Sequence, residues 1–131
     1  MDTEIKIDEK VVEIPEVKAT SKITYEDFKK VEITLGKILS AEKIEGSEKL
    51  LKLMVDFKEE SGPRQILSGI QKYFPDESVL VGQKCMFVTN LEPRKMMGME
   101  SNGMLFALGG SDVPFSLITA GDDVPEGTRA N

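Results

Sequence analysis

Apolar and polar residues alternate along several short segments of this chain, and each alternating segment predicts a β-strand. In residues 51–57 (LKLMVDF) every odd-numbered position is apolar, and a period of two is typical of a strand with one buried face. The same period in residues 31–35 (VEITL) predicts a preceding strand. The apolar phase changes between Gly36 and Ile38, which predicts a β-bulge at the glycine, as a bent first strand in a small barrel requires.

Turn-forming residues divide the rest of the chain into a succession of short elements. They predict turns at 45–49 and 58–63, strands at 64–70, 84–89 and 104–108, a short helix that ends at Gly82, a polar Met-rich loop at 91–103, a weaker strand at 115–119 and a turn region at 121–131. Five short strands with one helix between the third and the fourth match the OB-fold, a small all-β barrel. An open β-sandwich would give a similar count, usually with more strands. We expect one such domain over residues 23–131.

The chain ahead of the first strand predicts a short helix and an N-terminal extension. Thr24 and Asp27 fit a capping box, and Phe28 and Val31 are expected to face inward from one or two helical turns. Residues 1–22 alternate charged residues with Val and Ile, which fits either a linker or an extra edge strand.

Composition removes most catalytic and metal chemistry. The chain has one cysteine and no histidine, which excludes histidine-dependent nucleophilic catalysis and most zinc and iron sites. Cys85 alternates with Phe87 and is expected to be a buried, inert thiol. Ser40 and Lys43 form an isolated S-x-x-K at a strand end, whereas a serine–lysine hydrolase needs this motif on a helix. We predict no catalytic residue, no metal and no cofactor.

The same composition indicates a cytoplasmic protein without a membrane segment. No run approaches the ~20 apolar residues of a membrane span, the N-terminus lacks a secretory signal, and a single cysteine suits a reducing compartment. The net charge of −6 argues against general nucleic-acid binding. Residues 62–110, with five basic and four acidic side chains, are the one stretch that is net positive, which allows a local basic face.

Several segments, taken in order, resemble one known family. They are DFKKVEITLGKI, EKLLKLMVDF, RQILSGI, VGQKCMFVTNLEPRKMMGMESNGMLFAL and the closing VPEGT. Together they are similar to the tRNA-binding domain found at the C-terminus of methionyl-tRNA synthetases, as their separate β subunit, and in the endothelial-monocyte-activating polypeptide. The resemblance covers about residues 23–128. It implies an OB-fold that binds the tRNA corner by shape, often as a homodimer, although related members include a small bacterial chaperone.

The resemblance also implies a set of RNA-contacting residues. In and around the loop before the fifth strand, these residues are Asn90, Lys95, Ser101 and Met104. In the third strand, they are Arg64, Gln65 and Ser68. Arg94 joins them because a cation beside Lys95 can contact phosphates. Family members often have basic residues where this chain has Thr34 and Met97, which lowers the expected affinity for tRNA.

Some of these residues fit structural roles as well. Arg64 fits a phosphate contact and a turn residue equally. Ser68 with Gly69 fits close strand packing better than direct binding. Met97 and Met99 fit plugs at one end of the barrel better than an adaptable contact surface, while Met96 fits both.

The sequence therefore predicts a non-catalytic module that docks the tRNA corner and delivers tRNA to methionyl-tRNA synthetase, as a C-terminal domain or β subunit. Tethering would raise the local tRNA concentration at a separate catalytic core. The expected partners are tRNA, the synthetase catalytic region in the same or another chain, and a second copy in a homodimer. Residues 1–22 would be a linker or a dimer-forming extension. The alternative is a chaperone-like or assembly dimer of the same fold that binds protein, which the net charge of −6 favours.

Overall fold

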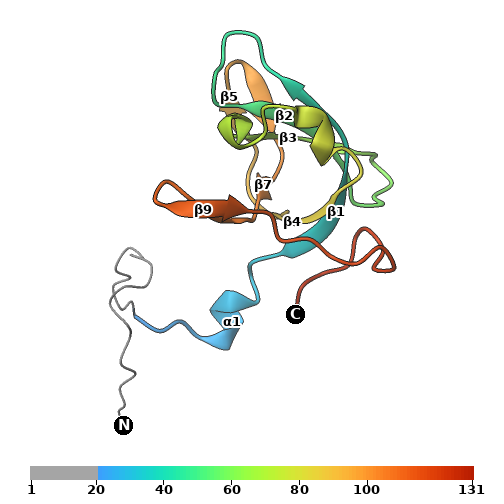
Figure 1. The fold of residues 1–131 in the computed structure, drawn as a ribbon. Helices are drawn as coiled ribbons and strands as arrows, with labels where there is room; N and C mark the ends of the chain where they lie inside the picture. The colour runs from blue at the N-terminus through green and yellow to red at the C-terminus, as the bar shows by residue number, and fades with distance from the viewer. Residues whose placement is uncertain (1–20) are drawn as a thin grey trace.

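Five strands form one antiparallel sheet that curls into a barrel in the computed structural model, which describes residues 21–131 (Figure 1). A backbone hydrogen bond of 2.8 Å from the Asn102 amide to the Gln65 carbonyl joins the segment before the last of these strands to the third and closes most of the remaining gap. The OB-type barrel expected from the sequence is confirmed. The strands, in the spatial order β3-β2-β1-β4-β7, are β1 (Ile33–Lys43), β2 (Leu51–Asp56), β3 (Arg64–Ser68), β4 (Lys84–Val88) and β7 (Met104–Leu105).

Strand β1 bends, and its two halves pair with different strands. Residues 33–37 pair with β4, and residues 37–43 pair with β2. The register shifts between Ile38 and Ser40, so the β-bulge lies there, and the prediction of a bulge at Gly36 is wrong. The bend itself was predicted correctly, because a strand that serves two partners in a small barrel must coil.

Gly36 is required for packing inside the barrel. A Cβ atom at this position would lie 2.5 Å from side-chain atoms of both Val55 and Phe57. Real Cβ contacts are essentially never shorter than 3.0 Å, so any larger residue would have to displace two core side chains. The glycine in the apolar pattern therefore marks a close approach between the β1 backbone and the side chains of Val55 and Phe57.

The barrel interior is filled by one cluster of apolar side chains. In β2, Leu51, Leu53 and Val55 are fully buried, as the alternation in the sequence predicted. Phe57 and Phe87 meet edge to face, with ring centroids 5.5 Å apart. The cluster consists of Ile38, Leu51, Leu53, Val55, Phe57, Ile66, Ile70, Leu80, Cys85 and Phe87.

The short helices lie where the sequence placed them. In α1 (Tyr25–Phe28) the Thr24 side chain accepts a 3.0 Å hydrogen bond from the Asp27 amide, so the predicted cap is confirmed. The inward orientation predicted for Phe28 and Val31 is wrong, because 47% and 48% of their surface is exposed beside the barrel. The helix expected after β3 consists of two 3₁₀ turns, η1 (Gln71–Tyr73) and η2 (Glu77–Leu80). No helix within residues 21–131 is long and apolar enough to cross a membrane.

Two hairpins replace segments that the sequence analysis assigned differently. The predicted loop at 91–103 contains β5 (Arg94–Met96) and β6 (Met99–Ser101), which are joined by Met97 and Gly98 at φ 53° and 77°. Two consecutive residues with positive φ are typical of a tight hairpin turn. Beyond β7, a second hairpin contains β8 (Leu108–Gly110) and β9 (Val113–Ser116) in place of the strand expected at 115–119.

The C-terminal segment is also more ordered than the expected run of turns. The Leu35 amide donates to the Thr128 carbonyl at 2.8 Å, and the Ala130 amide donates to the Ile33 carbonyl at 2.9 Å. These bonds lie along the first half of β1, on the edge that β2 does not reach. The segment thus pairs a strand edge that would otherwise have unsatisfied backbone groups.

We predict that Gly36→Ala lowers the free energy of unfolding by about 1–3 kcal/mol, as expected for overpacking of a core. Urea denaturation followed by circular dichroism would measure the change. Gly69→Ala is the matched control, because a Cβ there would meet no atom within 4 Å and should change stability little. Equal stability of Gly36→Ala and the parent protein would contradict the packing role of this glycine.

Candidate nucleic-acid interface

The β5–β6 hairpin presents two cations to solvent. Arg94 and Lys95 are exposed on β5, and their cross-strand neighbours on β6 are Ser101 and Glu100. Within residues 21–131, neither cation has an acidic side chain within ion-pair distance. Both charges are therefore available to a ligand, although Glu100 lies opposite Lys95 in the hairpin and moderates the local potential.

Side chains of β3 and β6 bind the hairpin to the barrel. Gln65 Nε2 donates to the Glu100 carbonyl at 2.9 Å. Ser101 Oγ accepts a 3.0 Å hydrogen bond from the Leu67 amide and donates to the Gly103 carbonyl at 3.1 Å. Ser101 is only 3% exposed, so its hydroxyl is used inside the protein. In this structure Gln65 and Ser101 position the hairpin, and their polar atoms face the backbone.

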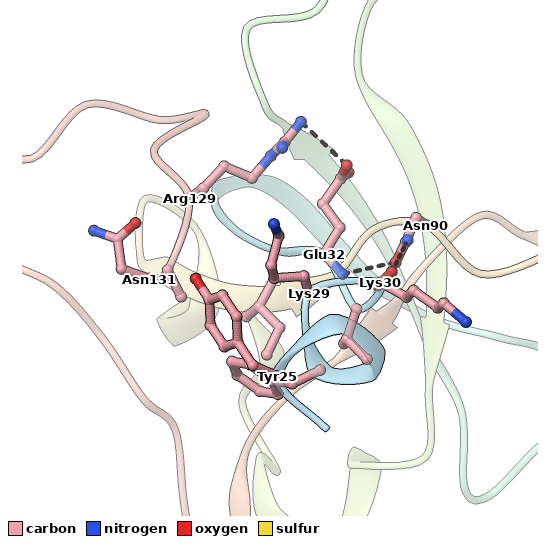
Figure 2. A pocket seen from close by; sticks show the side chains of 11 residues that line it. Tyr25, Lys29, Lys30, Glu32, Asn90, Arg129 and Asn131 are labelled. Carbon is pink, nitrogen blue, oxygen red and sulfur yellow. Dashed lines mark hydrogen bonds and ion pairs between the residues drawn. The ribbon is translucent and has the colours of Figure 1, made fainter. Parts of the chain in front are cut away.

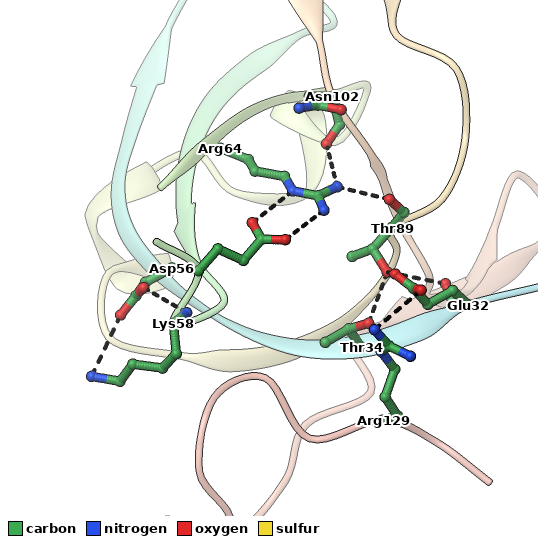
Figure 3. Close-up of polar contacts among 9 residues, drawn as sticks. Glu32, Thr34, Asp56, Lys58, Arg64, Thr89, Asn102 and Arg129 are labelled. Atoms are coloured by element: carbon green, nitrogen blue, oxygen red, sulfur yellow. Dashed lines mark hydrogen bonds and ion pairs between the residues drawn. The ribbon is translucent and has the colours of Figure 1, made fainter. Parts of the chain in front are cut away.

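Arg64 is similarly engaged within the protein, as Figure 3 shows. Its Nε and Nη2 atoms donate to the two carboxylate oxygens of Glu59 at 2.9 and 2.7 Å. Its Nη1 atom donates to the carbonyls of Thr89 at 2.8 Å and Asn102 at 3.3 Å. The Arg64 side chain is 16% exposed, and its hydrogen bond holds the pKa of the Glu59 carboxyl below the ordinary value.

Asn90 connects the end of β4 to the segment that follows α1. Its Oδ1 atom accepts a 2.8 Å hydrogen bond from the Glu32 amide, and its Nδ2 atom donates to the Lys30 carbonyl at 2.6 Å (Figure 2). These bonds form one wall of a pocket of about 350 Å³ that Tyr25, Lys29 and Arg129 also line. The pocket lies beside α1 and the end of the C-terminal segment, and none of its lining residues belongs to the β5–β6 hairpin.

The remaining candidate residues divide between surface and strand end. Met104 is 45% exposed, and Ser68 is half-buried at the end of β3. Close packing does not explain Gly69, because a Cβ at that position would have open space around it. Met97 does not plug the barrel as expected, since it is 53% exposed at the hairpin tip, whereas Met99 is half-buried.

A polar network beside Arg64 was missed by the sequence analysis. The hydroxyls of Thr34 and Thr89 lie 2.7 Å apart, and Thr89 Oγ1 also lies 2.7 Å from Glu32 Oε1. The other carboxylate oxygen of Glu32 lies 3.1 Å from Arg129 Nη2 (Figure 3). Residues from β1, the end of β4 and the C-terminal segment meet here. No local pattern in the sequence signals this meeting, because the partners are up to 97 positions apart (129 minus 32).

Cys85 lacks the environment of a reactive thiol. It is fully buried in the core cluster, and burial raises the pKa of its thiol to about 11. The predicted burial of Cys85 is therefore confirmed, and its inertness stays a prediction that this environment supports.

We predict that Cys85 of the native protein reacts negligibly with Ellman's reagent at pH 8, where about one thiol in a thousand would be ionised. The same protein in denaturant should release one equivalent of the coloured thiolate rapidly. Fast stoichiometric reaction of the folded protein would show that the thiol is accessible and would contradict this assignment.

The architecture alone defines the class of this domain. A five-stranded barrel of this order, with a cationic hairpin between its fourth and fifth barrel strands, has the arrangement of OB-fold domains that bind nucleic acids through this inter-strand loop.

Comparison with known proteins identifies the family. Residues 33–129 match the family described as "Putative tRNA binding domain". A MetRS-related protein from Pyrococcus horikoshii has a similar structure, with a TM-score of 0.78 and 37% sequence identity over 85% of this chain and 99% of that protein. The chain belongs to this tRNA-binding domain family, as its sequence indicated.

Longer relatives place the domain within larger proteins. The methionine–tRNA ligase of Caldanaerobacter subterraneus is 44% identical over 96% of this chain, and that of Methanoregula boonei is 50% identical over 84%. The chain spans only 19% and 16% of these ligases. The matched region is an accessory tRNA-binding domain, so the chain is non-catalytic, as predicted. The chaperone CsaA of Bacillus anthracis shares the fold, with a TM-score of 0.72 and 23% identity over 85% of this chain and all of that protein.

Proposed function

We propose that this chain docks the corner of tRNA through the β5–β6 hairpin and thereby supplies tRNA to a methionine–tRNA ligase. The observation that carries the proposal is the hairpin itself, which presents Arg94 and Lys95 without acidic partners among residues 21–131 and is bound to β3 through Gln65 and Ser101. A rigid cationic hairpin can follow the phosphate backbone without reading bases. Tethering to a ligase would then raise the local concentration of tRNA at the catalytic core.

The arrangement of the aromatic side chains supports recognition of RNA shape over recognition of single strands. Tyr73 and Phe115 stack on each other with ring centroids 4.5 Å apart, and Phe74 packs edge-on against Phe115. Phe57 and Phe87 are in the core. Tyr25, Phe28 and Phe106 are exposed, but none of them belongs to the β5–β6 hairpin. Because single-strand binders offer aromatic surfaces for base stacking, a hairpin without aromatic rings favours a folded RNA as the ligand.

We predict that folded total tRNA binds with roughly micromolar affinity at low salt and that Lys95→Gln reduces the dependence of log K on log salt by about one. The reason is the loss of one phosphate contact. Fluorescence anisotropy of labelled tRNA over a range of salt concentrations would measure both quantities.

Lys29→Gln is the matched control, since it removes the same charge from the C-cap of helix α1, on the other side of the barrel (Figure 1). It should leave the slope unchanged. Absence of binding at low salt by the folded parent protein would refute the proposal for this chain, and equal effects of the two variants would move the contact away from the hairpin.

We also propose that a second copy of the chain associates through an apolar stripe that runs from β7 to the start of β8. Met104, Phe106 and Leu108 alternate along the chain and are 45%, 40% and 57% exposed. Met104 lies in β7, the outermost strand of the sheet, and Leu108 begins β8, so the stripe starts at the edge of the barrel sheet. An exposed apolar stripe also supports the alternative function, which is binding of another protein. The oligomeric state of the purified chain distinguishes self-association from this alternative.

We predict that the parent protein sediments as a dimer at micromolar concentration and that Phe106→Ser shifts it toward the monomer. The change removes apolar area from the centre of the stripe. Analytical ultracentrifugation would measure the populations, with Val79→Ser as control, because Val79 is 51% exposed on η2 and lies outside the stripe. A monomeric parent protein that captures unfolded polypeptide through the stripe would favour the protein-binding alternative.

A further inference from the structure

A single guanidinium joins both ends of the segment that contains the cationic hairpin. Arg64 Nη1 donates to the carbonyl of Thr89, directly after β4, and to that of Asn102, directly after β6. Residues 90–101 leave and return to the barrel between these two carbonyls. Figure 3 shows the guanidinium between the two carbonyls, with a carboxylate on its other side.

The orientation of this guanidinium is set by Glu59. Both carboxylate oxygens are engaged, by Nε at 2.9 Å and by Nη2 at 2.7 Å, which is the paired geometry that fixes a planar guanidinium most firmly. Since Nη1 belongs to the same plane, fixing the Nε and Nη2 edge also fixes the direction of Nη1. The guanidinium further lies over the Phe57 ring, 5.3 Å from its centroid, so it rests on the barrel core.

Glu59 is itself held at a defined place. It lies in the turn between β2 and β3, where its carbonyl accepts a 3.0 Å hydrogen bond from the Gly62 amide. The contacts therefore run from this turn through Glu59 and Arg64 to the two ends of the hairpin segment. The two carbonyls flank that segment, and all of the other partners lie in separate parts of the chain, so the contacts can set its position independently of RNA.

We propose that Glu59 and Arg64 form a positioning pair that holds the β5–β6 hairpin in the pose that receives RNA. The proposal rests on the proposed tRNA-binding function of the hairpin. In this assignment Arg64 acts through two backbone carbonyls and not through a phosphate. It has an unusual consequence: Glu59, an acidic residue in a protein that binds a polyanion, strengthens RNA binding.

The sign of one substitution separates positioning from direct contact. Glu59→Gln removes a negative charge, which by long-range electrostatics alone would favour RNA. If the pair positions the hairpin, tRNA affinity should instead fall roughly three- to tenfold, because part of the preorganisation is lost, with the salt slope unchanged. If Arg64 is a phosphate contact that Glu59 masks, affinity should rise and the slope should become steeper. The latter result would overturn the proposal.

Glu60→Gln is the matched control for charge and turn. Glu60 is the next residue along, is exposed, and forms no ion pair with another residue in the described range 21–131. We expect its substitution to leave affinity unchanged or slightly higher. A loss equal to that of Glu59→Gln would show that the turn, and not the pair with Arg64, matters, and would also overturn the proposal.

Arg64→Lys tests the fork geometry at constant charge. A lysine ammonium cannot bind the carboxylate through two fixed atoms and reach both carbonyls. We therefore expect a loss of affinity similar to that of Glu59→Gln, with the salt slope unchanged. Parent-like affinity of Arg64→Lys would indicate that only the charge is needed and would contradict a positioning role.

Amide hydrogen exchange tests the pair without RNA. In Glu59→Gln, amides of residues 94–101 should exchange at least severalfold faster, while core amides of β2 keep their protection. Unchanged exchange in the hairpin would refute positioning whatever the RNA result. Conversely, faster exchange in a protein that binds no tRNA would retain the positioning pair and refute only the proposed function.

Discussion

Backbone pairing along β1 is the interaction on which the other parts of this domain depend. One strand supplies partners for β4 and β2 in succession, and the bulge between Ile38 and Ser40 provides the bend between the two halves. The missing side chain of Gly36 lets Val55 and Phe57 pack against the strand at this point. Without the bend the sheet would stay open. Strand β3 could then not reach Asn102, which directly follows the β5–β6 hairpin and donates a backbone hydrogen bond to Gln65.

Several polar residues of the family motif hold the β5–β6 hairpin in place and do not form its exposed surface. Gln65 and Ser101 bind the hairpin backbone, and Arg64 binds the carbonyls at its base. Arg94 and Lys95, by contrast, are exposed on β5 of the hairpin. A chain with a net charge of −6 can thus present a local positive feature, because the hairpin that carries the two cations is bound to the barrel through Gln65 and Ser101.

Local patterns in the sequence predicted what local forces determine. Alternation located β2 and the core cluster, and the Thr24 cap located α1. The β5–β6 hairpin was missed because its residues are polar or Met and do not alternate, and its turn depends on the backbone angles of Met97 and Gly98. The pairing of Arg64 with Glu59, Thr89 and Asn102 could not be predicted, because contacts between separate segments leave no mark on the periodicity of either. The family resemblance implied an RNA contact for Arg64, which stays a prediction, and it could not say that the guanidinium binds Glu59 and two carbonyls.

The placement of α1 and of the C-terminal segment has a consequence for how such a domain can be combined with others. Both lie at the end of the barrel away from the β5–β6 hairpin (Figure 1). A neighbouring domain joined after the C-terminal segment would therefore start at the pole opposite the hairpin and leave the hairpin unobstructed. The backbone hydrogen bond from Leu35 to Thr128 fixes the C-terminal segment against β1. The barrel therefore sets the direction in which a domain joined to this segment would start. A domain whose attachment point and hairpin lie at opposite ends can be joined to proteins of different size, with only the length of the connecting chain changed.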